Sequence, residues 1–454
     1  MFKAIALGFA GFLSSFGQPE VPPDIEPYRP LNWETSAVFE LSYQDDPTVQ
    51  EIIKRYVNQL GEQGKSTARQ GIWVQSPWIP LGQHQGTEPL SAASLTKVAT
   101  TYAAINKWSL THQFETKIYR TGSISNGVLT GDLVIEGGSD PLFVWEEAIA
   151  LGNALNDAGI REVKGDLIVV GNFLMNYAVD TRVSAQTLRM GMNQDLWSAE
   201  VARQHRTMPA GTSKPQVSIS GSTKKLNALP GNTALVVTHK SLVLSEILKL
   251  MNIYSNNAIA EVIAQNLGAG PQMGKDVAAE LDIPANELQL INGSGLGVDN
   301  RISPRAAVMM FQAIADSITD DTLAVSDLFP VAGRDKRGTM KDRKMPKGII
   351  AKTGTLNQVS ALAGMIPTSE HGDVWFAIIN NGTWDIRGYR RQQDEFLQSL
   401  DNHWQLTPLS SMLIDISKDF FGNPDRIKLS EMNVDENAAK DATFSSAPFT
   451  KTNL

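Results

Sequence analysis

Cysteine is absent from this chain of 454 residues, and the six histidines are scattered along it. The lack of cysteine excludes disulfide scaffolds, thiol nucleophiles, zinc ribbons and iron–sulfur clusters. The histidines do not form an HExxH-type pair, so a histidine-rich metal site is not expected either. We therefore expect no metal and no cofactor, and any covalent catalysis has to use a hydroxyl group as its nucleophile.

Basic residues are outnumbered by acidic ones, 40 to 48, which gives a net charge of −8, and long basic runs are missing. Binding to nucleic acid needs clustered positive charge to neutralise phosphates, so nucleic acid is not an expected partner. At 42% hydrophobic residues the chain is too apolar to be disordered. It is also too long for one ordinary domain of ~100–200 residues, and we expect at least two globular units.

Long apolar runs are lacking as well, apart from an uncharged stretch at residues 4–17 that follows Lys3. A membrane-spanning helix needs ~20 apolar residues, and this run is shorter. We interpret residues 1–17 as a signal peptide, with cleavage after Gly17, and an uncleaved anchor is the alternative. The protein is then expected in the periplasm or secreted, with at most peripheral membrane contact.

The pattern of apolar residues predicts an interrupted domain. Helical periodicity is expected at 48–60, 92–108, 144–158 and 241–267, the last with a break near residue 255, and buried strands at 349–352 and 374–379. Glycine-punctuated short apolar runs between residues 120 and 230 indicate a small α+β insertion. The predicted order is a signal peptide (1–17), an irregular lead-in (18–47), a main domain (48–119 plus 231–425), an inserted domain (120–230) and a disordered tail (426–454).

Without thiols or clustered histidines, lysine is the obvious base for a serine nucleophile, and an S-x-x-K tetrad places the two on one helix face. Two tetrads occur, Ser94–Lys97 and Ser222–Lys225, and about one is expected by chance in a chain of this composition. Ser222 lies in a polar, turn-like segment, which favours an exposed loop. Ser94 opens an alanine-rich helix, where free backbone N–H groups and the helix dipole are available.

Two further motifs follow Ser94 in the chain. Ser255-Asn256-Asn257 interrupts a predicted helix, and Lys352-Thr353-Gly354-Thr355 follows a predicted strand. Each motif alone has a structural explanation, as a helix cap, a kink or an edge-strand charge. The ordered set S-x-x-K, S-x-N and K-T-G is much more specific, because it requires three independent coincidences.

With these motifs the chain resembles the class C low-molecular-mass penicillin-binding proteins, the serine D-alanyl-D-alanine carboxypeptidase/endopeptidase family. The similarity extends from about Glu88 to about Gly382. The resemblance implies an α+β fold, a penicillin-binding-protein/β-lactamase-like transpeptidase domain whose antiparallel sheet is flanked by helices. The 161 positions between Ser94 and Ser255 are too many for an uninterrupted version of this fold, which supports the inserted domain.

The resemblance also implies a reaction on peptidoglycan peptides ending in D-Ala-D-Ala, and covalent inhibition by β-lactams. Its catalytic residues map to Ser94 (nucleophile), Lys97 (general base), Ser255 (proton relay), Asn257 and Lys352. The substrate-binding residues map to Thr353, Gly354 and Thr355, and the backbone N–H groups of Ser94 and Thr355 would form the oxyanion hole.

The chain departs from the family pattern at two places. Asn292 and Val298 stand where the family commonly has an acid and an arginine, and the segment after Phe173 does not match the family's acid-containing loop. Asp180 and Asp195 are the candidates for that acid. Weak dependence on the third residue of the peptide is therefore expected.

Three other functions fit the sequence less well. A class A β-lactamase would have its S-x-N motif nearer the serine and a deacylating glutamate beyond it, and neither pattern is visible. A non-catalytic protein that binds β-lactams or the cell wall is disfavoured, because all motif residues are intact. A Ser-His-Asp hydrolase is disfavoured by the absence of G-x-S-x-G.

Overall fold

The computed structural model describes residues 46–178, 180–319, 322–369, 371–404, 406 and 419–430. The predicted signal peptide, nearly all of the predicted lead-in and residues 431–454 lie outside these ranges. Among the helices that are described, none combines the length and the apolar character needed to cross a membrane.

A five-stranded antiparallel sheet forms the centre of the domain that carries the three motifs. Its strands, in spatial order, are β15 (Ile350–Leu356), β16 (Val359–Pro367), β17 (Asp373–Asn381), β1 (Gln70–Gln75) and β2 (Pro80–His84). Side chains of a strand alternate between the two faces of its sheet. Phe376 and Ile378 of β17 therefore belong to one apolar cluster, whereas Trp375 and Ala377 belong to another. Both faces are buried, which explains the continuous apolar runs in the sequence.

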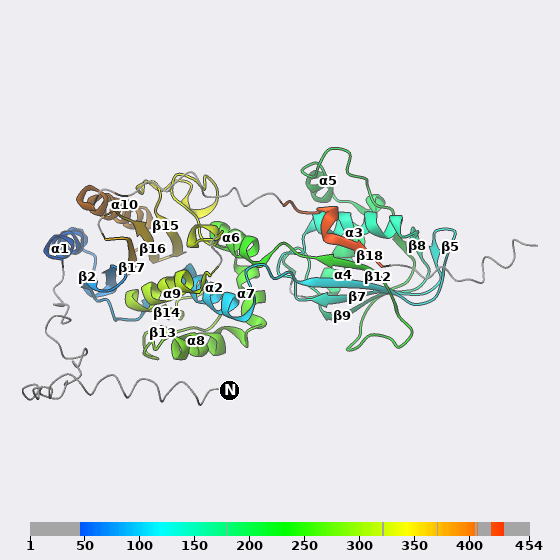
Figure 1. The fold of residues 1–454 in the computed structure, drawn as a ribbon, viewed down its shortest axis with the longest axis horizontal. Helices are drawn as coiled ribbons and strands as arrows, with labels where there is room; N and C mark the ends of the chain where they lie inside the picture. The colour runs from blue at the N-terminus through cyan, green and yellow to red at the C-terminus, as the bar shows by residue number, and fades with distance from the viewer. Residues whose placement is uncertain are drawn as a thin grey trace, which may run out of the picture. The chain divides into compact units, whose positions relative to one another are not determined.

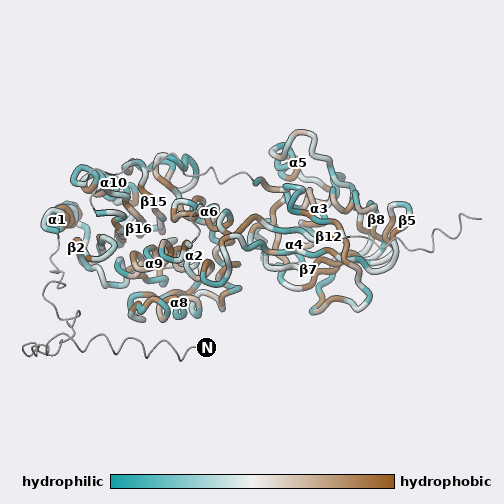
Figure 2. Tube along the Cα trace, in the orientation of Figure 1, coloured by the Kyte–Doolittle hydropathy of each residue, from teal (hydrophilic) through white to brown (hydrophobic). Residues whose placement is uncertain are grey.

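Helices cover both faces of this sheet (Figure 1). One face packs against α1 (Pro47–Glu62) and α10 (Ile386–Trp404). The helices of the other face are α2 (Thr96–Lys107), α6 (Leu244–Tyr254), α7 (Asn257–Gln265), α8 (Ala269–Glu280) and α9 (Pro304–Ser317). Figure 2 shows apolar stretches along the central strands between these layers. A small sheet of β13 (Leu288–Gln289), β14 (Arg301–Ile302) and β3 (Leu90–Ser91) completes this part.

A second, six-stranded mixed sheet has its own apolar core. Its strands, in spatial order, are β11 (Thr223–Lys225), β9 (Leu167–Asn172), β7 (Leu133–Gly138), β4 (Glu115–Arg120), β12 (Ala234–Lys240) and β18 (Ile427–Leu429). The associated helices are α3 (Trp145–Asp157), α4 (Thr181–Gly191) and α5 (Ala199–His205). Four short strands form a further sheet, β10 (Ser218–Ile219), β8 (Glu162–Val163), β6 (Val128–Leu129) and β5 (Ile124–Ser125). The predicted α+β class, with antiparallel strands flanked by helices, is confirmed.

The edges of the second sheet differ from the sequence prediction. The sheet begins at Glu115 and continues to Lys240, beyond the expected limits of 120 and 230. Strand β18 lies within the range predicted to be a disordered tail, yet it pairs with β12. Composition did not reveal this strand, because it has three residues and, of these, Ile427 packs against the core whereas Lys428 and Leu429 are exposed.

A buried ion pair anchors the segment that carries β18. Arg426 Nη2 lies 2.6 Å from Glu147 Oε1, and both side chains are at least nine-tenths buried. Glu147 also lies 2.7 Å from His239 Nε2 through its other carboxylate oxygen. Burial by itself raises the pKa of Glu147, but the bonds to His239 and Arg426 outweigh it and hold the pKa below its usual range.

Candidate active site

Ser94 lies in a 3-10 turn, Ala93–Leu95, that leads directly into α2. Ala93 has a φ of +50°, a conformation uncommon for a residue with a side chain. The backbone of Gly295 packs directly against this turn. A Cβ built on Gly295 would lie only 1.9 Å from the carbonyl oxygen of Ala93. Gly295 itself has a φ of +81°, so glycine is required there for two reasons.

Lys97 lies one turn further along, and its side chain is fully buried. Its Nζ is 3.1 Å from Ser94 Oγ, 2.8 Å from Asn257 Oδ1 and 2.6 Å from the carbonyl oxygen of Ser294. The structure thus brings together the first motif, the asparagine of the second motif, and a loop carbonyl that the sequence did not identify.

Burial lowers the pKa of Lys97 to about 7, and the nearby Glu261 opposes this shift. A neutral amine has two N–H donors and one lone pair. Two of the three neighbours, Asn257 Oδ1 and the Ser294 carbonyl, are pure acceptors and occupy both donors. The lone pair is then directed at the hydroxyl of Ser94, which is the arrangement that a general base requires.

Ser255 lies at the break between α6 and α7, in a left-handed conformation with a φ of +52°. This break turns Asn257 into the first residue of α7, facing Lys97. The hydroxyl of Ser255 accepts a 3.0 Å hydrogen bond from Lys352 Nζ. Lys352 is fully buried, and burial together with the charge of Lys97 lowers its pKa well below the usual value. Each of the two motif serines thus has a buried lysine at hydrogen-bond distance.

The K-T-G motif lies on β15 against the turn of Ser94. A Cβ on Gly354 would lie 2.6 Å from the carbonyl oxygen of Ala92 and 3.2 Å from the Cβ of Ala93. Glycine therefore lets the strand approach the turn of Ser94 closely. Of the two hydroxyls that flank Gly354, that of Thr353 donates to Thr339 at 2.7 Å, whereas Thr355 is exposed and accepts from Arg390.

Glu261 on α7 is a site residue that the sequence analysis missed. Its carboxylate accepts from the backbone N–H groups of Gly293 and Ser294 at 3.2 and 3.0 Å. It thereby fixes the loop whose carbonyl bonds Lys97. The available signal was its position on the same helical face as Asn257, four residues further on.

The second S-x-x-K match forms no such pair. Ser222 Oγ bonds Asp166 Oδ1 at 3.0 Å, whereas the Nζ of Lys225 lies 3.5 Å from Thr181 Oγ1. Asp180, a candidate for reading the substrate side chain, caps α4 by accepting from the N–H groups of two following residues. Asp195 lies in a short 3-10 turn near Trp197.

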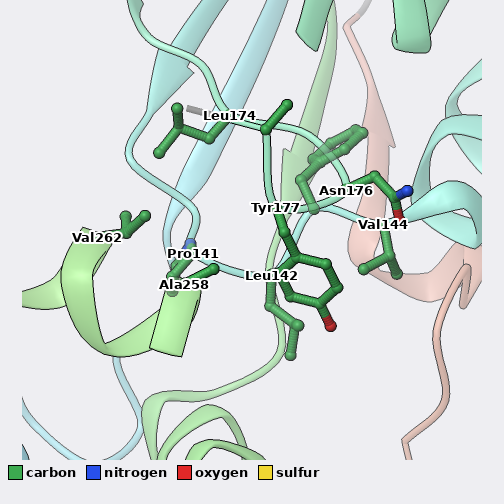
Figure 3. A pocket seen from close by; sticks show the side chains of 10 residues that line it. Pro141, Leu142, Val144, Leu174, Asn176, Tyr177, Ala258 and Val262 are labelled. Atoms are coloured by element: carbon green, nitrogen blue, oxygen red, sulfur yellow. The ribbon is translucent and has the colours of Figure 1, made fainter. Parts of the chain in front are cut away.

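The segment after Phe173 instead brings an aromatic side chain to the S-x-N motif. Figure 3 shows Tyr177 beside Leu142 and Val144, across a small pocket from Ala258 and Val262 of α7. Ala258 directly follows Asn257 in the chain. The ten residues that line this pocket in the described part of the chain include no acid and no base. The wall beside the S-x-N motif is therefore predominantly apolar.

Comparison with known proteins identifies a family and relatives of this chain. The model of the D-Ala-D-Ala carboxypeptidase 3 (S13) family matches residues 55–174 and 208–401. D-alanyl-D-alanine carboxypeptidase of Actinomadura sp. (strain R39) is 23% identical over 411 residues, which covers 66% of this chain and 75% of that protein. D-alanyl-D-alanine carboxypeptidase DacB of Haemophilus influenzae is 23% identical over 405 residues, which covers 66% of this chain and 82% of that protein.

Solved structures share the fold. The predatory peptidoglycan endopeptidase Bd3459 of Bdellovibrio bacteriovorus superposes with a TM-score of 0.65 at 20% identity, covering 79% of this chain and 98% of that one. Penicillin-binding protein 4 of Haemophilus influenzae, in complex with a β-lactam, gives a TM-score of 0.56 at 22% identity, covering 76% and 98%. The interrupted architecture is therefore common to these proteins.

Proposed function

Because the chain belongs to the D-Ala-D-Ala carboxypeptidase 3 (S13) family, we propose that it is a serine-type D-Ala-D-Ala carboxypeptidase with Ser94 as nucleophile. The observation that carries this proposal is the environment of Lys97. Its amine is buried, has a lowered pKa, and lies between two acceptors and the Ser94 hydroxyl. A lysine that only stabilised the fold would be expected to pair with a carboxylate.

In the acylation step Ser94 Oγ attacks the carbonyl carbon of the penultimate D-Ala. Lys97 takes the hydroxyl proton and becomes an ammonium ion. The backbone N–H groups of Ser94 and Thr355 are the proposed donors to the developing oxyanion. Asn257 holds the amine in place through its side-chain oxygen, at 2.8 Å.

Collapse of the tetrahedral intermediate breaks the peptide bond, and the leaving nitrogen of the terminal D-Ala must gain a proton. We assign this transfer to Ser255, whose hydroxyl is oriented by Lys352 at 3.0 Å. The proton originates on Lys97 and returns the base to its neutral form. Water then attacks the ester with the same base, which releases the shortened peptide and regenerates Ser94.

The hydrogen-bond donors on β15 match the carboxylate at the end of the substrate. Lys352 and the hydroxyls of Thr353 and Thr355 are the proposed contacts for this carboxylate, and Thr353 would turn its proton from Thr339 to the substrate. Gly354 allows the strand to lie beside the nucleophile. A β-lactam has an amide and a carboxylate in the same relation, so it acylates Ser94. Since such peptides belong to the cell wall, the site of action is extracytoplasmic.

Intact mass spectrometry after exposure to penicillin tests the assignment. We expect one adduct per chain, mapped by peptide digestion to Ser94, that is lost in Ser94→Ala and retained in Ser222→Ala. D-Ala release from a peptide ending in D-Ala-D-Ala, and cleavage of a cross-linked peptide, then measure carboxypeptidase and endopeptidase activity. An adduct that persists on Ser94→Ala would refute the proposal. Rapid loss of the adduct with hydrolysed penicillin as product would indicate a β-lactamase instead.

A further inference from the structure

Arg390 occupies an unexpected position at the end of β15. It lies in the second turn of α10, and its Nη2 donates a 2.9 Å hydrogen bond to Thr355 Oγ1. In the sequence Arg390 is close to Arg387 and Arg391, a cluster typical of a solvated helix face. Arg387 is exposed, and Arg391 is exposed and pairs with Glu395, but Arg390 is half-buried and turned toward the K-T-G strand.

The guanidinium of Arg390 lacks an acidic partner. Among the described residues, no carboxylate lies within ion-pair distance of it. The carboxylates that influence it from further away, Asp394 and Asp342, are outweighed by burial and by Arg343, so the pKa of Arg390 is lowered from its usual value. Asp394 is itself paired with Arg343 at 2.7 Å. A half-buried cation therefore remains available for an anion that is not part of this chain.

The hydrogen bonds of Thr355 point to the same conclusion. A hydroxyl has one proton, and Thr355 Oγ1 accepts from Arg390, so its own proton is directed elsewhere. Within the described residues no acceptor for that proton is found, and the residue is exposed. The hydroxyl of Thr353, in contrast, already donates to Thr339. Thr355 and Arg390 thus present two adjacent donors toward solvent at the end of the strand.

We propose that Arg390 is a specificity-determining residue that binds the terminal carboxylate of the substrate together with Thr355. This inference rests on the proposed function and assigns a recognition element to it. A guanidinium forms strong, charge-assisted hydrogen bonds with a carboxylate and can contact both of its oxygens. Arg390 also orients the Thr355 hydroxyl, so that its proton meets the same carboxylate. Substrates that end in a neutral group lose both advantages.

The test uses two substrates that differ in one group, a peptide ending in D-Ala-D-Ala and the same peptide ending in D-Ala-D-alaninamide. We expect Arg390→Gln to lower kcat/KM for the free acid roughly 10- to 100-fold, the range for a hydrogen bond to a charged group. For the amide the change should stay below about threefold. Arg390→Lys keeps the charge but loses the planar fork, and should fall between wild type and Arg390→Gln for the acid.

Arg387→Gln and Arg391→Gln are matched controls, because they remove the same charge from the same helix at exposed positions. They should leave both substrates within about twofold of wild type. Equal losses on acid and amide in Arg390→Gln would overturn the inference, since they would mean that Arg390 merely supports β15. If Arg390→Gln is active and its ratio of kcat/KM for the acid to kcat/KM for the amide equals that of wild type, the inference is overturned as well. These outcomes differ from failure of the proposed function, in which wild type neither releases D-Ala nor reacts with penicillin.

Discussion

The backbone carbonyl of Ser294 accepts a 2.6 Å hydrogen bond from the Nζ of Lys97, 197 residues away in the chain. This contact uses one of the donors that the lysine would otherwise share with Ser94. Glu261 holds the Ser294 loop by accepting from two of its backbone N–H groups. The state of the lysine therefore depends on a loop that none of the three sequence motifs includes.

The pKa of Lys97, lowered by burial to about 7, predicts the pH dependence of acylation. Below pH 7 the amine is protonated and has no lone pair for the Ser94 proton, and above pH 7 it is neutral. We expect the rate of penicillin acylation to rise with pH through a midpoint near 7 and then to level off. Stopped-flow measurement with a chromogenic β-lactam gives this profile. Lys97→Ala should lower the rate at least ~10²-fold and remove the pH-dependent limb. Near-normal acylation by a folded Lys97→Ala protein would place the base elsewhere.

Glu261→Gln should move the rising part of the pH profile of acylation toward lower pH. The negative charge of Glu261 raises the pKa of Lys97, so its removal lets the pKa fall further. The plateau rate should also drop, because the Gln side chain provides one carbonyl acceptor where two N–H groups need acceptors. The control is Glu51→Gln, which removes an exposed carboxylate on α1. A lower plateau with an unmoved midpoint would show that Glu261 supports the loop without influencing the lysine charge.

Gly354→Ala tests the close approach of β15 to the nucleophile turn. The added methyl group would meet the Ala92 carbonyl at 2.6 Å, so strand and turn have to separate. We expect a loss of acylation rate of more than ~10-fold and destabilisation of about 1–3 kcal/mol. The control is Gly61→Ala in α1, where the added Cβ would lie 3.5 Å from the Cγ2 of Thr67, an ordinary contact. This variant should leave the rate unchanged. Equal rates for the two variants would contradict the tight packing.

The positions of Ser94, Lys97 and Lys352 show which parts of the site could be predicted from the local sequence pattern. A serine at a helix start and a lysine three residues later can be predicted to meet, because helix geometry alone determines it. The break at Ser255 and the buried strands were likewise predicted, since a polar triplet interrupts an apolar helix and β15 to β17 are apolar on both faces. The roles of these residues remain predictions.

Contacts set by the tertiary structure were not predictable in the same way. The Ser294 carbonyl is a backbone group and leaves no mark in the sequence. Arg390 was indistinguishable from Arg387 and Arg391, because which of three arginines faces the sheet depends on the rotation of α10 about its axis. In the sequence Arg426 looks like a surface charge in a polar tail. Its partner, Glu147, is 279 positions away in the chain, so the buried pair is visible only in the structure.

The Arg426–Glu147 pair predicts a measurable loss of stability. Arg426→Ala leaves the buried Glu147 with His239 alone, and loss of one partner from a buried pair costs about 3–5 kcal/mol. Urea unfolding should show this loss, whereas Arg182→Ala, which removes an exposed pair with Asp180, should change stability by less than about 1 kcal/mol. If both variants unfold at the same urea concentration, the buried pair does not anchor the segment.

The apolar residues around Tyr177 and the exposed Val298 predict weak selection at the third residue of the peptide. The residues around Tyr177 carry no charge that could attract a diaminopimelate or lysine side chain, and Val298 is 59% exposed at a position where an arginine was expected. We expect kcat/KM for D-Ala release to differ less than ~10²-fold among peptides with diaminopimelate, lysine or an uncharged third residue, and Val298→Arg to sharpen the preference. A larger wild-type preference for diaminopimelate would show that another group, such as Asp180 or Asp195, reads the side chain.

The pairing of β18 with β12 has a consequence for dividing the molecule. Strand β12 has β4 on one side and β18 on the other, so a fragment that ended after Lys240 would expose one row of backbone N–H and C=O groups. Exposed edges of this kind pair with other chains and promote aggregation. A soluble fragment of the second sheet should therefore require residues 419–430, supplied by fusion or as an added peptide. These residues are needed although almost two hundred positions separate them from Lys240 in the chain.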